Sequence, residues 1–484
     1  MSCVLAALAR AEDDRCALVD AAGSMSYREL RNVVQTVAQQ LPSAGHWRAA
    51  VLADNGRAWV IADLALLMRA ATSVPIPKFF STAQIEHVLN DAAIECVFTD
   101  QAELVREIDP AFEPRRMPQI GLSLLVRRCT GSALPSRTAK VTYTSGSTGM
   151  PKGVCLPQSS IESVGKSLQQ VTGGLALKRH LSLLPLSTLL ENVAGMYVPL
   201  LAQSTFCVPS LDATGVTYGG IDAARLISCI DRYGPDSLVL VPELLRALIV
   251  QRERGWRPAQ PLRFIAVGGA RVSPADVEHA HELGLPVYEG YGLSECSSVV
   301  CLNTPEAARM GSVGRPLPHA AVRTDARGEL HVRGAVMSGY LGSTALADDE
   351  IATGDLGEID DEGFVYVRGR AKNLIITSLG RNISAEWIES ALLREPVITQ
   401  AMVVGEAQPF LSALIVSEAT DEQIHAALTN VNVLLPDYAR VRAWRRLARP
   451  LSRQEGLLTL NGRLRREAIA ARYASTITAL FAAP

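Results

Sequence analysis

The chain has 484 residues, a formal net charge of −2, and 48% hydrophobic and 20% charged residues, an ordinary mix for a globular protein. This charge gives no reason to expect nucleic acid or an anionic membrane as a partner, and no run of about 18 uncharged apolar residues predicts a transmembrane segment. Nine cysteines without a CxxC pair, and an N-terminus that lacks the charged start of a signal peptide, predict a cytoplasmic protein with reduced thiols.

Strand-like and helix-like patterns alternate along the first part of the chain. Short apolar runs typical of buried strands are followed by segments with helical periodicity. The expected strands cover residues 49–53, 94–99, 180–184, 205–208, 237–241 and 263–267, and the expected helices cover 57–71, 83–91, 158–171, 189–202, 222–232, 242–252 and 274–283. This rhythm predicts an α/β fold with largely parallel sheets that helices cover on both faces.

The character of the chain changes near residue 320. Residues 320–369 contain short strands between glycine turns and predict a small β unit. Beyond it the patterns are mixed, and we expect strands at 373–377, 398–404 and 411–416, a helix near 385–393, and further helices. We place a domain boundary near Lys372, which gives an N-terminal domain of residues 1–371 and a C-terminal domain of residues 372–484.

The most informative stretch is 143–153, YTSGSTGMPKG. Strand patterns at 139–143 and 154–156 predict a hairpin with this stretch at its tip. The glycines permit close backbone approach, so successive N–H groups can surround an anion, and the hydroxyl groups and Lys152 add donors and charge. A polar surface loop is the alternative reading. The predicted polyphosphate ligands are Thr144, Ser145, Gly146, Ser147, Thr148, Gly149 and Lys152.

This loop resembles, almost residue for residue, the phosphate loop of the adenylate-forming superfamily, which includes acyl-CoA synthetases, adenylation domains of peptide synthetases and firefly luciferase. It is not a Walker loop, because Gly146 and Gly149 are too close together and Lys152 follows Pro151. The resemblance recurs in order along most of the chain and is closest to fatty acyl-CoA synthetases. It implies a large domain of stacked, mainly parallel sheets with a small β unit, followed by a small, mobile α+β lid.

Two further segments supply nucleotide contacts in the resembling family. YEGYGLSE (288–295), expected to follow an apolar strand LGLPV, offers glycines for a flat base and a hydroxyl and carboxylate for Mg²⁺ and phosphate, although a plain strand-to-turn junction is the alternative. The resemblance assigns Mg²⁺ binding to Glu295 and adenine packing to Tyr291, and it places VGGA (267–270) beside the base and the acyl group. The implied contacts are Gly268, Gly269, Ala270, Glu289, Gly290, Tyr291, Gly292 and Ser294.

TGDLGEID places Asp355 between two glycines, and a guanidinium follows at Arg370. A carboxylate can accept hydrogen bonds from both ribose hydroxyls, although an aspartate in a turn is more often a turn former. The resemblance assigns both residues to the ribose. The segment 369–389 matches the family's hinge and lid signature, which implies a hinge at Lys372 and a thiol tunnel bordered by Gly380, Arg381 and Asn382.

LTLNGRLRREAI (458–469) matches the family's closing motif with one departure. Arg463 stands where the family has a lysine that reaches the acid carboxylate and the α-phosphate. Arginine keeps the charge on a broader and more rigid fork, so the exchange is not conservative. We expect Arg463 to keep this role, with Thr148, Lys152 and Glu295 as the other catalytic residues.

The resemblance implies an acid–thiol ligase that uses ATP and Mg²⁺ to convert a carboxylic acid to acyl-AMP and passes the acyl group to CoA. The expected pocket segments 184–200, 236–246 and 267–270 are mainly apolar, which favours a fatty or aryl acid, and Ser187 and Thr188 occupy the gate position. One alternative is a ligase that loads the phosphopantetheine arm of a carrier protein. A second is a nucleotide-binding homologue that lost catalysis with the change to Arg463.

Overall fold

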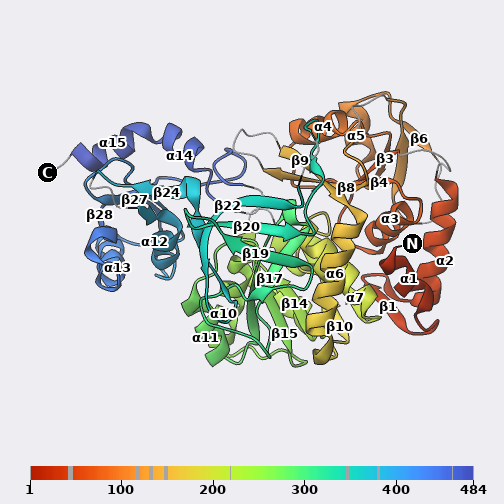
Figure 1. The fold of residues 1–484 in the computed structure, drawn as a ribbon, viewed down its shortest axis with the longest axis horizontal. Coiled ribbons are helices and arrows are strands. Elements are labelled where there is room, and N and C mark those ends of the chain that lie inside the picture. Colours follow the sequence, from red (N-terminus) through yellow and green to blue (C-terminus); the bar gives the residue numbers. More distant parts are fainter. Residues whose placement is uncertain are drawn as a thin grey trace. The chain divides into compact units, whose positions relative to one another are not determined.

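The computed structural model describes residues 2–41, 47–115, 120–129, 134–145, 151–217, 220–344, 346, 348–378, 382–459 and 462–482 (Figure 1). The chain divides into two compact units. The first unit comprises Met1–Gly269, Pro274–Val322 and Val332–Ile351, and the second comprises Ala270–Ser273, Arg323–His331 and Ala352–Pro484.

One sheet of the first unit has the order β18-β17-β16-β15-β14-β10-β11-β1-β2. Its neighbours from β16 to β1 pair in parallel, and β2, β17 and β18 add antiparallel edges. The strands are Cys16–Asp20 (β1), Gly23–Ser26 (β2), Arg179–Leu181 (β10), Thr205–Cys207 (β11), Ser237–Leu240 (β14), Phe264–Val267 (β15), Val287–Leu293 (β16), Ser298–Leu302 (β17) and Arg315–Pro316 (β18).

A second sheet of the same unit has the order β21-β9-β8-β4-β3-β5-β7-β6. The four strands β8, β4, β3 and β5 pair in parallel, and the remaining pairs are antiparallel. The strands are Arg48–Leu52 (β3), Thr72–Pro75 (β4), Cys96–Thr99 (β5), Glu113–Arg115 (β6), Ser123–Val126 (β7), Thr138–Ser145 (β8), Pro151–Pro157 (β9) and Gly339–Tyr340 (β21). The prediction of largely parallel sheets is therefore confirmed for the centres of both sheets.

Helices connect these strands and supply much of the apolar core. The helix α3 is apolar around most of its circumference and buries Trp59 completely, as expected for a helix without a solvent face. The helices are Cys3–Arg10 (α1), Tyr27–Gln40 (α2), Arg57–Met68 (α3), Thr82–Asp91 (α4), Ala102–Ile108 (α5), Gln158–Thr172 (α6), Val198–Leu201 (α7), Leu211–Thr214 (α8), Ala223–Tyr233 (α9), Pro242–Glu253 (α10) and Pro274–Glu282 (α11), with a π-helix at Glu191–Tyr197 (η2). One continuous hydrophobic cluster joins α2, α3, α6 and η2 to strands of both sheets.

One sequence-based prediction of local structure was wrong. The segment LGLPV is not a strand; β16 begins only at its last residue, Val287, and continues through YEGYGL, where it pairs with β17. Asp355 lies inside a strand, so it is not the turn former of the alternative reading. The helix predicted at 189–202 is present, with a π-helical stretch over Glu191–Tyr197 followed by α-helix over Val198–Leu201.

A sheet of order β19-β20-β22-β23 has most of its residues in the second unit, which also holds a sheet of order β26-β27-β28. The strands are Ala320–Thr324 (β19), Glu329–Gly334 (β20), Glu350–Ile359 (β22), Val365–Arg370 (β23), Leu374–Ile376 (β24), Asn382–Ser384 (β25), Gln400–Val404 (β26), Leu411–Val416 (β27) and Val441–Arg446 (β28). The helices are Ala385–Leu392 (α12), Asp421–Leu434 (α13), Arg466–Arg472 (α14) and Ala474–Ala482 (α15). The strand β28 was not predicted, because its arginines interrupt any apolar alternation.

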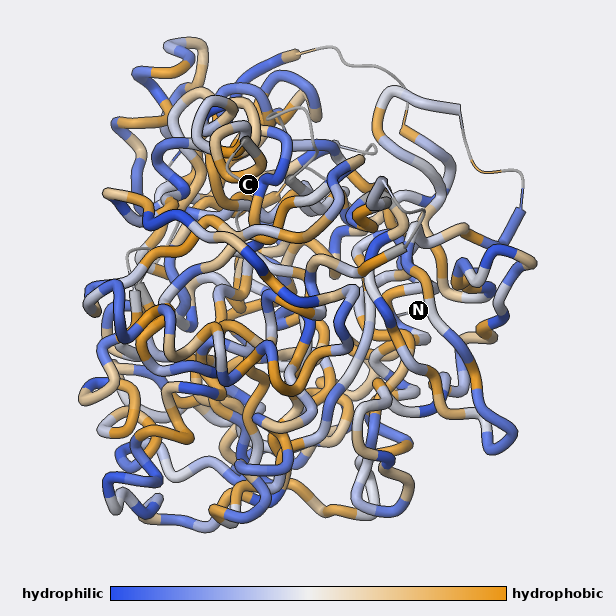
Figure 2. The backbone as a smooth tube through the Cα atoms, turned by 90° about the vertical axis from the view of Figure 1, so that its left-hand side faces the viewer, coloured by the Kyte–Doolittle hydropathy of each residue, from blue (hydrophilic) through white to orange (hydrophobic). Residues whose placement is uncertain are grey.

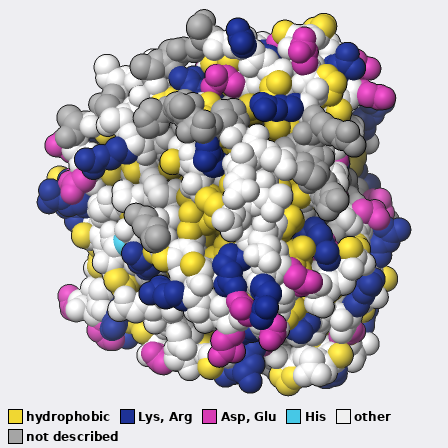
Figure 3. Space-filling model, turned by 90° about the vertical axis from the view of Figure 1, so that its right-hand side faces the viewer, with side chains coloured by type: hydrophobic (Ala, Val, Ile, Leu, Met, Phe, Trp, Pro, Cys, Tyr) yellow, Lys and Arg dark blue, Asp and Glu magenta, His cyan; other side chains and the backbone are white. Residues whose placement is uncertain are grey.

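The surface and the helices match the composition. Apolar and polar stretches alternate along the backbone in Figure 2, and none of the helices in the described residues is long and apolar enough to cross a membrane. On the face drawn in Figure 3, positive and negative side chains are interspersed, in agreement with a net charge near zero.

Candidate functional site

The stem of the predicted phosphate loop is an antiparallel hairpin. Tyr143 pairs with Gly153 and Thr144 pairs with Lys152, which confirms the predicted hairpin at this position. A side chain at Gly153 would lie 2.9 Å from Val141 and 3.1 Å from Leu341, so the close packing of this stem requires glycine. Lys152 is exposed, as a residue that meets a ligand must be before the ligand binds.

The structure describes five of the predicted phosphate ligands only partly or not at all. Gly146, Ser147, Thr148 and Gly149 fall outside the described residues, and only the backbone of Ser145 is described. The hairpin stem fixes where this loop begins and ends. The roles of the loop residues therefore stay predictions from the sequence.

The YEGYGLSE segment packs closely against its neighbours through its glycines. A Cβ atom at Gly292 would lie 1.7 Å from the carbonyl oxygen of Ser298 on β17, and one at Gly268 would lie 2.8 Å from the carbonyl oxygen of Gly290. Glu289, Tyr291 and Ser294 are half-buried in the same stretch. The glycines thus let backbone strands approach each other, while the side chains between them stay partly accessible.

The predicted Mg²⁺ ligand Glu295 is held in place by the second sheet. The Tyr340 hydroxyl donates a hydrogen bond to Glu295 Oε1 at 2.9 Å, and the Met337 N–H donates to the Glu295 carbonyl oxygen at 2.7 Å. Tyr340 lies on β21, where it pairs with Val154 of β9, the strand that leaves the phosphate loop. The fold therefore brings the stem of the phosphate hairpin and the half-buried Glu295 carboxylate together.

Three segments predicted to form the acid pocket meet at one point. A Cβ atom at Gly269 would lie 3.7 Å from Val241 Cγ1 and 4.0 Å from Leu190 Cδ2. Gly269 has a φ of 80°, which favours glycine, and the nearest side chains are aliphatic. At the predicted gate, the Thr188 hydroxyl is bound to the Pro185 carbonyl oxygen at 2.7 Å, and Ser187 is buried.

Behind this pocket wall, the π-helix η2 carries a buried polar network that sequence analysis did not find. Lys140 Nζ lies 3.0 Å from Asp63 Oδ1, and the Tyr197 hydroxyl donates to Asp63 Oδ2 at 2.7 Å. Asn192 bonds both Lys140 and Asp63, and burial lowers the pKa of Lys140 although Asp63 opposes that shift. Both ends of η2 are thereby tied to α3 and β8. Bonded partners on different elements are at least 52 residues apart in the chain, so no spacing in the sequence indicates this network.

On the same π-helix, Glu191 is completely buried and contacts His180 Nε2 at 3.4 Å. His180 Nδ1 lies 3.1 Å from the Ser237 hydroxyl. A side chain at Gly195 would come within 2.1 Å of Glu191 Oε1, so only glycine leaves room for this carboxylate. Glu191 is the nearest acidic residue to the predicted gate, and its carboxylate is engaged inside the fold.

In the second unit, the two predicted ribose contacts are partners. Asp355 on β22 pairs with Arg370 on β23, and Arg370 Nε lies 2.8 Å from Asp355 Oδ1. The Arg370 guanidinium also donates to the Thr353 carbonyl oxygen at 2.8 Å. This ion pair fixes the direction of both groups, and their ribose contacts stay predictions.

The closing motif forms a tight turn in the second unit. The Thr459 N–H donates to the Arg463 carbonyl oxygen at 2.6 Å, and the Arg463 N–H donates to the Thr459 hydroxyl at 3.0 Å. Gly462, between them, has a φ of 76°. The Arg463 side chain is exposed at this turn. The predicted tunnel residues Gly380 and Arg381 lie outside the described residues, as do the side chains of Asn382 and the hinge residue Lys372. Ala270 belongs to this second unit, whereas Gly268 and Gly269 belong to the first.

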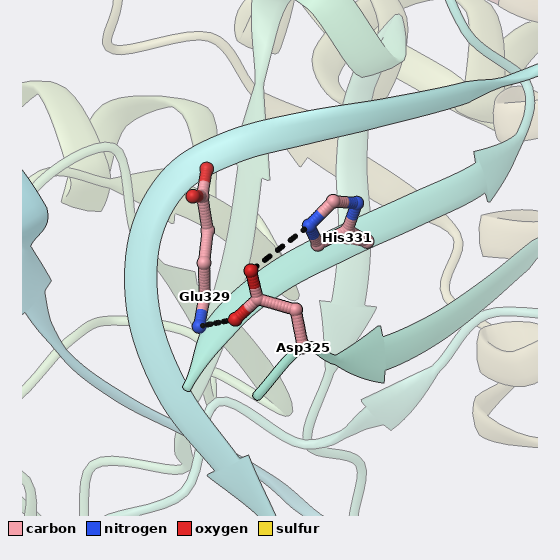
Figure 4. A group of neighbouring side chains, drawn as sticks. All are labelled: Asp325, Glu329 and His331. Carbon is pink, nitrogen blue, oxygen red and sulfur yellow. Dashed lines mark hydrogen bonds and ion pairs between the residues drawn. The ribbon is translucent and has the colours of Figure 1, made fainter. Parts of the chain in front are cut away.

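Another cluster of ionisable groups lies at the turn between β19 and β20. Asp325, Glu329 and His331 gather there (Figure 4), with His331 Nε2 3.8 Å from Asp325 Oδ2. Asp325 Oδ1 accepts the N–H groups of Arg327 and Glu329, each at 2.8 Å, and Glu329 Oε1 accepts the Gly354 N–H at 2.8 Å. These bonds explain the cluster as a turn that its own side chains stabilise.

The comparisons with known proteins identify the family. A family model described as AMP-binding enzyme matches residues 5–341, and a model described as AMP-binding enzyme C-terminal domain matches residues 372–484. The chain belongs to the AMP-binding enzyme family. The resemblance to the adenylate-forming superfamily that the phosphate loop indicated is thereby confirmed.

Relatives of this AMP-binding enzyme include acid–CoA ligases. A long-chain-fatty-acid–CoA ligase of Mycobacterium bovis is 28% identical over 94% of this chain and 91% of its own length. A 2-succinylbenzoate–CoA ligase of Bacillus mycoides is 29% identical over 81% of this chain and 83% of its own. The expectation of an AMP-forming acid–thiol ligase is confirmed at this level.

Two solved structures confirm the fold class, a large α/β domain followed by a small C-terminal domain. An anthranilate CoA ligase in complex with anthranoyl-AMP has a TM-score of 0.80 at 17% identity, covering 99% of this chain and 98% of the other. The O-succinylbenzoate CoA synthetase of Bacillus subtilis, in complex with its acyl-adenylate intermediate, has a TM-score of 0.78 at 23% identity, covering 97% and 98%.

Proposed function

We propose that this enzyme activates an apolar carboxylic acid with ATP and passes the acyl group to the thiol of CoA. The observation that carries the proposal is the hydrogen bond from Tyr340 to Glu295, because it joins the YEGYGLSE segment to β21, which pairs with the strand that leaves the phosphate loop. A carboxylate beside a predicted polyphosphate loop suits a metal-bound triphosphate. The CoA-ligase relatives support CoA rather than a carrier protein as acceptor.

The proposed chemistry has two displacements. A carboxylate oxygen of the acid bonds to the α-phosphorus of ATP, and pyrophosphate leaves with the electrons of the broken P–O bond. The thiol sulfur of CoA then bonds to the acyl carbon, AMP leaves, and the thiol proton is released. The first displacement needs neutralised phosphate charge, alignment of the reacting oxygen, and exclusion of water.

This chain's residues fit the first requirement. Glu295 holds a carboxylate whose Oε1 accepts from Tyr340, so the carboxylate is oriented before a ligand arrives. We assign Mg²⁺ to Glu295; when bound there, the ion would neutralise charge on the phosphates. Lys152 and the exposed Arg463 supply further positive charge, and Asp355 with Arg370 supply the proposed ribose contacts. Lys372 is the proposed hinge between domains 1–371 and 372–484.

The choice of acid follows from the wall at Gly269. Leu190 and Val241 are its nearest side chains, and both are aliphatic. The nearest acidic residue, Glu191, is buried against His180 and is not placed to bind a substrate ammonium. We therefore propose a fatty or aryl acid rather than an amino acid. Nine free cysteines agree with a proposed cytoplasmic setting.

The test is exchange of labelled pyrophosphate into ATP, measured with a set of fatty, aryl and amino acids. We expect exchange that depends on an apolar acid and is absent without it. Exchange supported by amino acids alone would contradict the proposed acid, and no exchange with any acid would favour a nucleotide-binding homologue without catalysis. Product formation with CoA against carrier protein then tests the acceptor.

A further inference from the structure

The most exposed large apolar side chains of the described residues lie together in the second unit. Val433 and Leu434 at the C-terminal end of α13 are 74% and 75% exposed, and Tyr438 just beyond them is 51% exposed. The other exposed large apolar side chains are only 37% to 47% exposed and are scattered along the chain, at Met68, Val250, Met310 and Leu346. We name Val433, Leu434 and Tyr438 the apolar tip.

The apolar tip is a rigid feature rather than a frayed end. Asn432 donates to the Val441 carbonyl oxygen at 2.8 Å and accepts the Val441 N–H at 2.9 Å, which joins the end of α13 to the start of β28. The Arg440 guanidinium donates to the carbonyl oxygen of Asn432 at 3.0 Å and closes the helix end. Figure 1 shows α13 and β28 next to each other in this unit. The tip side chains therefore protrude from a fixed base.

Two arginines lie beside the tip, in a segment whose basic character the composition of the whole chain conceals. Residues 438–472 contain ten arginines and two glutamates, a net charge of +8, in a chain whose net charge is −2. Arg440 and Arg442 lie beside the tip and are 44% and 57% exposed on their side chains, and both contact Asp437. The acidic residues of α13, Asp421 and Glu422, begin the helix about 20 Å away along its axis.

We propose that the apolar tip and its flanking arginines dock this enzyme on an anionic lipid bilayer. Exposed aliphatic and tyrosine side chains enter the boundary between headgroups and acyl chains, and arginines beside them bind lipid phosphates. The tip is a protruding helix end, whereas a protein partner of ordinary size would need about 800 Å² of complementary surface. A few protruding apolar side chains with two exposed arginines beside them fit a lipid surface better.

This docking concerns reversible binding at the surface and not insertion, since no described helix can cross a membrane. It goes beyond the proposed ligase activity and does not depend on it. It also revises the expectation, drawn from the net charge, that an anionic membrane is not a partner. A net charge of −2 is the sum of a basic segment and an acidic remainder. If the activity is as proposed, the lipid surface is where an apolar acid would be most concentrated.

The test is co-sedimentation of the full chain with phosphatidylcholine vesicles that contain either no phosphatidylglycerol or about one part in three. We expect binding to the anionic vesicles, weak binding to the neutral ones, and release by salt. The double variant Val433→Asp with Leu434→Asp should bind the anionic vesicles at least about tenfold more weakly. The variant Arg442→Glu should lower affinity about fivefold to tenfold and abolish the lipid preference.

Two matched controls separate docking from general effects. Val250→Asp changes an exposed apolar residue of the first unit, and Arg254→Glu changes an exposed arginine there; both should bind vesicles as the parent does. Because the readout is binding, a chain without ligase activity still tests the proposal. Equal binding by the tip variants would overturn it. The proposal would also be overturned if the parent chain did not bind anionic vesicles, even if it bound an acidic protein. It would be overturned as well if the parent chain were a dimer and a tip variant a monomer, because the tip would then be a contact between two copies.

Discussion

Two polar clusters of the first unit have similar chemistry and opposite environments. Around Lys140, a lysine, an aspartate, an asparagine and a tyrosine are buried and satisfy one another. Around Glu295, a carboxylate and a tyrosine lie half-buried beside a hairpin stem and are joined by a hydrogen bond. The polar groups of the buried cluster bond one another away from solvent, so this cluster stabilises the fold. The half-buried cluster is accessible and its carboxylate is oriented, so it suits a ligand.

The comparison shows that ionisable residues alone do not mark a site. Lys140 and Asp63 would look catalytic in a list of charged residues near the pocket, yet burial removes them from solvent and substrate. They tie η2, which directly follows Leu190 of the pocket wall, to α3 and β8. If this division is right, removing a group from the buried cluster must lower stability, and removing one from the other cluster must lower activity with little loss of stability.

The largest expected effect is on stability. Asp63→Asn leaves the Lys140 ammonium buried without a carboxylate, and the free energy of unfolding should fall by about 3–5 kcal/mol. Urea denaturation measures this loss. The matched control is Asp212→Asn, whose side chain is 81% exposed and pairs with Arg225, and it should cost less than about 1 kcal/mol. If Asp63→Asn lowered the free energy of unfolding by as little as the control, the cluster would not be important for stability.

The next effect is on catalysis. Glu295→Gln keeps the shape and removes the charge proposed to hold Mg²⁺, so pyrophosphate exchange should fall by about 10²–10³ with an unchanged melting temperature. Glu282→Gln, on the exposed side of α11, should exchange at the parental rate. Retention of most activity in the Glu295 variant would remove this residue from the proposed site.

The pH dependence of stability tests the burial of His319. Burial lowers the pKa of His319 from 6.5 to about 4. The unfolded chain therefore binds more protons between these values, and stability present above pH 6.5 should be lost as the pH falls towards 4, by about 3 kcal/mol. Denaturation at several pH values compares the parent with His319→Gln, whose loss over the same range should be smaller. Parallel curves would show that His319 is not buried as described.

The smallest effect sharpens the role of the half-buried cluster. Tyr340→Phe removes the hydroxyl that orients Glu295, and exchange should fall about fivefold to tenfold, with a higher Mg²⁺ requirement. Tyr366→Phe removes a comparable hydrogen bond, 3.1 Å from Asp360 in the second unit, and should leave the Mg²⁺ requirement unchanged. An identical Mg²⁺ requirement in both variants would mean that Tyr340 supports structure only.

The fold could be predicted well from local patterns, and the site less so. The alternation of strands and helices, and the hairpin at 143–153, depend on residues close in sequence, and they were confirmed. The Lys140 network and the Tyr340–Glu295 bond depend on pairs 45 or more residues apart, so only the fold brings them together. Likewise the π-helical stretch that begins at Glu191 is not indicated by helical periodicity.

The position of β28 has a consequence for solubility. It is the outer strand of the sheet β26-β27-β28, and an outer strand exposes backbone groups that can recruit a strand from another molecule. Arg442, Arg445 and Arg446 fall within its six residues. Two such strands brought side by side would place like charges against each other, so this edge resists the self-association to which an apolar edge would be prone.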